Sequence, residues 1–87
     1  MSDFYRTLFR VEAISKRNNQ TFLLGLLPGW STEHRFLIET TDIDLEVLNY
    51  VMQEIEITGA ARIFVEATLD EDNADDLEFR NLALIRK

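Results

Sequence analysis

The spacing of apolar residues constrains the fold of this chain more than any other feature of its sequence. Apolar and polar residues alternate along most of the length, as they do in half-buried β-strands. The period changes only once, between Thr40 and Gly59, where it becomes that of an amphipathic helix. We therefore expect a mainly β protein with one helix. The expected strands are residues 5–13, 21–27, 35–40, 61–69 and 77–86, and the expected helix is residues 43–57.

The order of these elements, three strands, a helix and two strands (β-β-β-α-β-β), resembles the OB-fold over nearly the whole chain. The resemblance rests on the order and length of the elements. It implies a small five-stranded OB-like Greek-key barrel, formed by a single domain of residues 1–87. An SH3-like barrel and an α+β sheet with one helix on a face are the alternatives, because strand periodicity does not distinguish long-range pairings.

Two positions predict irregular strands. Gly25 interrupts an otherwise apolar run, which is typical of a β-bulge or a sharp bend. In the last strand the apolar positions change parity between Phe79 and Leu82, so we expect a bulge near Asn81. For the helix, four residues at spacings of three and four predict the buried stripe, and Val51 widens it. The four are Leu45, Leu48, Met52 and Ile55.

The composition argues against catalysis and against a membrane segment. The chain has no cysteine, a single histidine and three separated glycines, so disulfides, thiolate metal sites and phosphate-binding glycine loops are not expected. The longest apolar run, residues 22–27, is too short to span a bilayer. We predict a protein that is not an enzyme, needs no cofactor or metal, and works in the cytoplasm.

The charges are divided between the two halves of the chain. Residues 1–41 carry five basic and four acidic side chains, whereas residues 42–87 carry four basic and twelve acidic ones. An acidic half can bind a basic protein, so we predict an accessory or regulatory module that acts through protein–protein interaction. The expected contact combines a loop tryptophan with an acidic hairpin. The hairpin does not match a calcium-binding EF-hand loop, because it lacks the required glycine and glutamate. These residues are Trp30, Asp70, Glu71, Asp72, Asp75 and Asp76.

The first half supports an alternative function. Its basic residues are interleaved with aromatic ones, and single-stranded nucleic acid is held by cations for the phosphates and rings for the bases. In OB-folds the central strands and the first hairpin loop form the usual binding face. The candidate nucleic-acid-binding residues are Arg6, Arg10, Lys16, Arg17, Trp30 and Arg35.

Two questions stay open at this point. Trp30 follows Pro28 and Gly29 in a loop, where its ring either covers the end of a small core or meets a partner. The chain is either a monomer or a homodimer that associates through an edge strand or through one flank of the helix.

Overall fold

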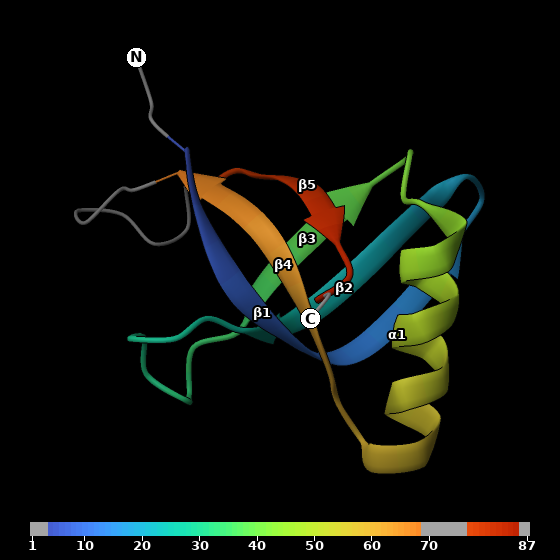
Figure 1. The fold of residues 1–87 in the computed structure, drawn as a ribbon, viewed down its shortest axis with the longest axis horizontal. Helices are drawn as coiled ribbons and strands as arrows, with labels where there is room; N and C mark the ends of the chain where they lie inside the picture. The colour runs from blue at the N-terminus through green and yellow to red at the C-terminus, as the bar shows by residue number, and fades with distance from the viewer. Residues whose placement is uncertain (1–3, 69–76, 86–87) are drawn as a thin grey trace.

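The computed structural model describes residues 4–68 and 77–85 of the chain, and the predicted element order is confirmed (Figure 1). The bounds of each element follow. They are β1 (Phe4–Arg17), β2 (Gln20–Leu26), β3 (Phe36–Thr40), α1 (Leu45–Thr58), β4 (Ala61–Thr68) and β5 (Phe79–Ala83).

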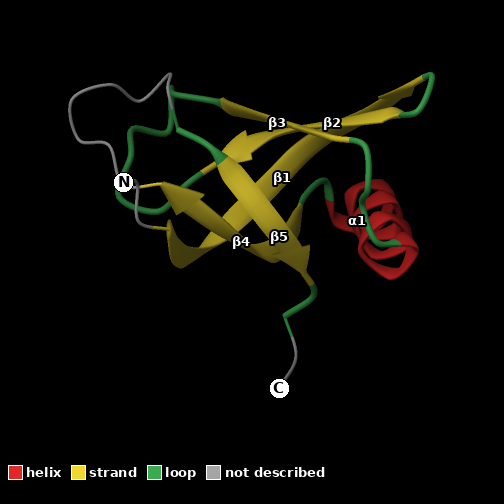
Figure 2. Ribbon diagram, turned by 90° about the horizontal axis from the view of Figure 1, so that it is seen from above, coloured by secondary structure: helices red, strands yellow, loops and turns green. Residues whose placement is uncertain are grey.

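The five strands form one antiparallel sheet in the order β3-β2-β1-β4-β5. Because β4 returns to lie beside β1 after the β1–β2–β3 meander, the connection is a Greek key. The sheet curls into a half-barrel, with the β2–β3 hairpin and the β4–β5 hairpin on opposite sides of β1 (Figure 2). The predicted small barrel with one helix is therefore confirmed. The barrel is open between its two edge strands, β3 and β5.

Strand β1 is long enough to serve both halves of the sheet. Its first part pairs with β4 and its second part with β2, and Arg10 and Val11 pair with both. The register with β2 shifts between Val11 and Ala13, opposite Gly25, so the bulge predicted at the glycine lies on the facing strand. A Cβ atom on Gly25 would collide with the carbonyl group of Arg10 and lie 3.0 Å from the ring of Phe9. Only glycine fits this close approach.

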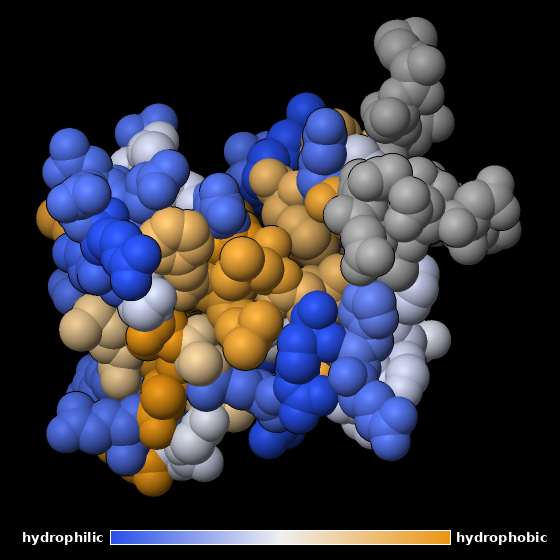
Figure 3. Space-filling view, turned by 180° about the vertical axis from the view of Figure 1, so that it is seen from behind, coloured by the Kyte–Doolittle hydropathy of each residue, from blue (hydrophilic) through white to orange (hydrophobic). Residues whose placement is uncertain are grey.

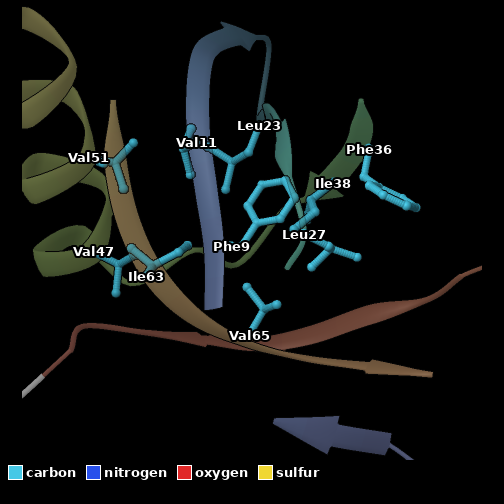
Figure 4. Packing of buried hydrophobic residues seen from close by; sticks show 11 residues of the cluster. Phe9, Val11, Leu23, Leu27, Phe36, Ile38, Val47, Val51, Ile63 and Val65 are labelled. Atoms are coloured by element: carbon cyan, nitrogen blue, oxygen red, sulfur yellow. The ribbon is translucent and has the colours of Figure 1, made fainter. Parts of the chain in front are cut away.

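The core lies inside the curl of the sheet and is closed at one end by α1. Figure 4 shows the side chains of Phe9, Val11 and Leu23 pointing into the same space as Val47 and Val51 of the helix. The fully buried large side chains are Phe9, Leu23, Ile63, Val11, Val51 and Val65.

Helix α1 begins at an Asp44 cap, whose carboxylate accepts a 2.8 Å hydrogen bond from the Glu46 amide, and ends at Gly59, which has a φ of 90°. The predicted buried stripe is wrong in part: Leu45 and Met52 are 70% and 47% exposed. The burial of Leu48 and Val51 is confirmed, and the helix also buries Val47. Among the described residues no helix is long and apolar enough to cross a membrane.

Strand β5 is shorter than predicted and contains the expected irregularity. Asn81 has a φ of 54°, and the pairing with β4 shifts register between Phe64 and Glu66. Asparagine tolerates this left-handed conformation better than most residues do. The bulge predicted near Asn81 is thus confirmed, and it makes the outer edge of β5 irregular.

Candidate functional site

Two arginines lie side by side on the outer face of the sheet. Arg10 of β1 pairs directly with Arg62 of β4, while their neighbours Phe9 and Ile63 point into the core. Both arginine residues are exposed. Like charges directly opposite each other in an antiparallel pair are destabilising. The register of β1 and β4 therefore places two positive side chains opposite each other, and the Nε atom of Arg10 also lies 4.0 Å from the carboxylate of Glu12.

These arginines border a cavity of about 430 Å³, which we call the arginine cavity. Strands β1, β2 and β4 and the loop after β2 contribute its lining. Its lining residues are Leu8, Arg10, Leu26, Leu27, Pro28, Gly29, Trp30, Thr32 and Arg62. An apolar floor with one large ring and two cations suits a ligand that has a flat apolar part and a negative group.

The structure confirms one of the two roles left open for Trp30, that of covering the end of the core, and the contact with a partner stays a prediction. Its ring is half-buried and makes an edge contact with Phe36, at 5.4 Å between centroids, next to the core. His34 packs on the same rings, 4.5 Å from Phe36. The other part of Trp30 lines the arginine cavity. The tryptophan therefore covers one end of the core and also forms part of the wall of the arginine cavity.

The remaining basic residues of the predicted nucleic-acid site do not line this cavity. Arg35 binds Glu12 at 2.7 Å and donates a hydrogen bond to the carbonyl oxygen of Thr32. Arg6 lies over the ring of Phe64, 4.1 Å from its centroid. Lys16 and Arg17 lie at the exposed end of the β1–β2 hairpin. Of the predicted set, only Arg10 and Trp30 line this cavity.

Arg62 was missed by the sequence analysis, because the charge count placed it in the acidic half of the chain. Its alternation with Ala61 and Ile63 could have placed it on the outer face. Its position opposite Arg10 depends on the register between two strands that are distant in sequence, which alternation does not reveal.

The acidic hairpin predicted as a partner contact, with Asp70, Glu71, Asp72, Asp75 and Asp76, lies outside the described residues. The strands on either side are joined by a pair of hydrogen bonds. The Thr68 amide donates to the Glu78 carbonyl oxygen, and the Glu78 amide donates to the Thr68 hydroxyl.

A second hollow lies between the edge strands β3 and β5, and we call it the seam groove. It comprises two adjoining cavities of about 460 Å³ and 390 Å³, which share Ile38, Glu39, Phe79 and Arg80. Its further lining residues are Phe4, Leu37, Thr40, Asp42, Ile43, Asp44, Leu77, Glu78, Asn81 and Leu82. In residues 36–40 and 79–83, no backbone hydrogen bond joins the two strands. The groove exists because this pairing is absent.

The groove is apolar inside and acidic at its rim. Its floor includes Ile38, which is 2% exposed, together with the half-buried residues Phe79 and Leu82. Four carboxylates border it: Glu39, Asp42, Asp44 and Glu78. Those of Glu39, Asp42 and Glu78 make no ion pair with a residue in ranges 4–68 and 77–85. These three negative groups are therefore available to a cation.

The basic residue of the groove is already engaged. The Nε atom of Arg80 donates to Oε1 of Glu66 at 2.9 Å, and its guanidinium lies over the ring of Phe4 at 3.7 Å. Asn81 donates to the same Glu66 oxygen at 3.0 Å. The hydrogen bond from Arg80, and then that from Asn81, hold the pKa of Glu66 below its ordinary value. Arg80 therefore contributes less positive charge to the groove than a free arginine would.

An apolar patch adjoins the groove on the outer face of the β2–β3 hairpin. Leu24 and Leu37 pair directly and are 37% and 53% exposed, while the adjacent pair Leu23 and Ile38 is buried. Figure 3 views the molecule from this side and shows apolar surface at its centre, bordered by hydrophilic residues. Because Leu37 also lines the seam groove, the patch and the groove are continuous.

Within the described part of the chain, no three His, Asp or Glu side chains are arranged to hold a metal ion. Comparison of the chain with protein-family models, curated proteins and solved structures finds no match.

Proposed function

We propose that this protein is a small, non-enzymatic binding module that acts through protein–protein interaction, and that its partner presents basic side chains. The observation that carries this proposal is the seam groove, in which an apolar floor is bordered by carboxylates that have no cation among the described residues. Apolar contact supplies affinity in such an interface, and charge supplies selectivity for the partner.

The surface beyond the groove extends the negative field. Residues 42–60, which contain α1 and its two ends, carry five acidic side chains and no lysine or arginine. Glu46 in the first turn of the helix and Glu56 in its last turn are both exposed. A basic partner approaching the groove is therefore attracted over a wider area than the contact itself.

The test is quantitative capture of a partner from an extract of the source cells. We expect a captured protein to be released by moderate salt and to be lost when the double variant Glu39→Gln and Glu78→Gln replaces the parent chain. The matched control is Glu54→Gln with Glu56→Gln, which changes the net charge equally but on the helix. Equal capture by both double variants would contradict a role for the groove.

Single-stranded nucleic acid is the second candidate ligand. It is favoured by the arginine cavity, where an electrostatically unfavourable pair, Arg10 and Arg62, lies beside Trp30. It ranks second because the outer face of β2 and β3, the usual OB-fold binding face, carries no basic side chain on these two strands and places Phe22 opposite Glu39. The net charge of −7 also opposes binding of a polyanion.

The fluorescence of Trp30 during titration with a short oligothymidylate tests this candidate, because Trp30 is the only tryptophan of the chain. A saturable change that salt reverses, and that Arg62→Gln weakens, would support nucleic-acid binding. An unchanged signal at low salt would remove it. The cytoplasmic location and the contact through the acidic hairpin at residues 70–76 remain predictions.

A further inference from the structure

The two edges of the half-barrel differ in their ability to accept another strand. The edge of β5 is interrupted by Asn81 in its left-handed conformation, and bulges of this kind protect edges against pairing. Strand β3 pairs with β2 in regular register from Phe36 to Thr40 and has no bulge and no proline. In the described part of the chain its other edge is unpaired, so its backbone groups there are open to a partner.

The side chains along β3 specify what a neighbouring strand must carry. Phe36 and Ile38 point inward and are 4% and 2% exposed, whereas Leu37 and Glu39 point outward. Residues of an added strand would alternate in the same way. Those pointing inward would cover Ile38 and Phe79, and those pointing outward would lie beside Leu37 and Glu39. Apolar residues that alternate with lysine or arginine satisfy both requirements.

The charges also select between a foreign partner and a second copy of this chain. Pairing of β3 with β3 from another copy would bring two acidic rims together, including both copies of Glu39, Asp42 and Glu78. Like charges at an interface cost free energy unless they are compensated. A basic segment instead places its cations against these carboxylates. Charge complementarity therefore favours a basic strand over a homodimer at this edge.

We infer that the seam groove binds one extended segment of its partner, with alternating apolar and basic residues, and that this segment pairs with the free edge of β3. This inference rests on the proposed function and adds the mode of binding. Main-chain hydrogen bonds to β3 provide affinity, and the alternating pockets of the groove provide selectivity.

The test titrates the full chain into a fluorescent peptide of alternating valine and lysine at physiological salt. The fluorescence anisotropy of the peptide reports its binding. In an extended strand, both the side chains and the backbone amides alternate in direction from one residue to the next. The amides of all the valines therefore point to one side of the strand, and those of all the lysines point to the other. Two further peptides carry N-methyl groups on all the valines or on all the lysines. We expect one of these peptides to bind at least about tenfold more weakly than the other, because only one set of amides faces β3.

A matched pair of protein variants locates the site. We expect Glu39→Lys to weaken binding of the unmethylated peptide about tenfold, and Glu56→Lys, which changes the net charge equally, to have a much smaller effect. Equal effects of the two methylated peptides, or equal effects of the two variants, would overturn strand addition at β3. A homodimer that buries the edge of β3 in the absence of peptide would also overturn strand addition.

A helical alanine–lysine peptide of equal charge separates this inference from the proposed function. Binding of the helical peptide without binding of the extended one would overturn strand addition and leave the basic-partner proposal standing. Failure of both peptides to bind would count against both proposals.

Discussion

The arginine cavity and the seam groove carry opposite charge for opposite structural reasons. In the arginine cavity, regular pairing of β1 with β4 forces Arg10 and Arg62 together. In the seam groove, β3 and β5 do not pair, so their side chains border an open hollow. The first site sets two like charges opposite each other within the sheet, and the second leaves one edge of β3 without a strand partner among the described residues. Each departs from the arrangement that stability alone would favour, which is common at functional sites.

Substitution of Gly25 is expected to have the largest effect, because this glycine adjoins both regions. It pairs with Phe36 at the start of β3 and contacts the carbonyl group of Arg10. We expect Gly25→Ala to lower the free energy of unfolding by more than about 2 kcal/mol, measured by urea denaturation. The control is Gly29→Ala, whose Cβ meets no atom within 4 Å but whose φ of 85° costs about 1 kcal/mol. Equal losses in the two variants would show that the contact at Gly25 is not tight.

A lysine in the apolar patch should separate binding from stability. Leu37 is 53% exposed, so we expect Leu37→Lys to change the free energy of unfolding by less than about 0.5 kcal/mol. The same variant should weaken binding of the alternating peptide about tenfold, through lost apolar contact and added repulsion. Ile57→Lys is the matched control, because Ile57 is 68% exposed at the other end of the helix, and it should change peptide binding much less. Comparable loss of binding in both variants would place the contact elsewhere.

Removal of one arginine of the opposed pair should stabilise the protein. We expect Arg62→Gln to raise the free energy of unfolding by about 0.2–1 kcal/mol at low salt, because the repulsion from Arg10 is relieved. The gain should shrink as salt is added, since exposed charges are screened. Urea denaturation at two salt concentrations measures both. A variant that is less stable than the parent at low salt would mean that Arg62 makes favourable contacts that outweigh the repulsion.

The smallest effect concerns the attachment of β5, which forms one wall of the seam groove. Glu66 binds Arg80 and Asn81, and its folded-state pKa is lowered. Its contribution to stability is therefore present above the unfolded-state pKa of about 4.3 and is lost as the pH falls through the folded-state value. The stability difference between the parent and Glu66→Gln should accordingly shrink below about pH 4 in urea denaturation. A difference that stays constant from neutral to acidic pH would contradict this role.

The sequence predicts the elements of this fold well because alternation reports the local environment of each residue. Period two located the strands, and the change of parity after Phe79 located the bulge at Asn81. The helix stripe was less reliable. Leu48 and Val51 are buried as predicted, but Val47 is buried while Leu45 and Met52 are exposed, because the face that meets β4 and β1 is set by how the helix crosses the barrel end.

Neither candidate site could be assembled from the sequence alone. The opposition of Arg10 and Arg62 and the approach of Glu39 to Phe79 both depend on strands that are far apart along the chain. Composition even misled in one respect, since Arg62 belongs to the acidic half by position but to the positive site in space. Pairing register and barrel opening are long-range properties, and alternation within one strand carries no information about them.

The central claim is that the seam groove, and not the arginine cavity, receives the partner. Amide spectra of the nitrogen-15-labelled chain, recorded with the alternating valine–lysine peptide and separately with oligothymidylate, observe both regions at once. We expect the peptide to shift signals from residues 36–40 and 79–82 and to slow hydrogen exchange along β3. Shifts with the peptide that centre on Arg10, Trp30 and Arg62, with β3 unchanged, would contradict it.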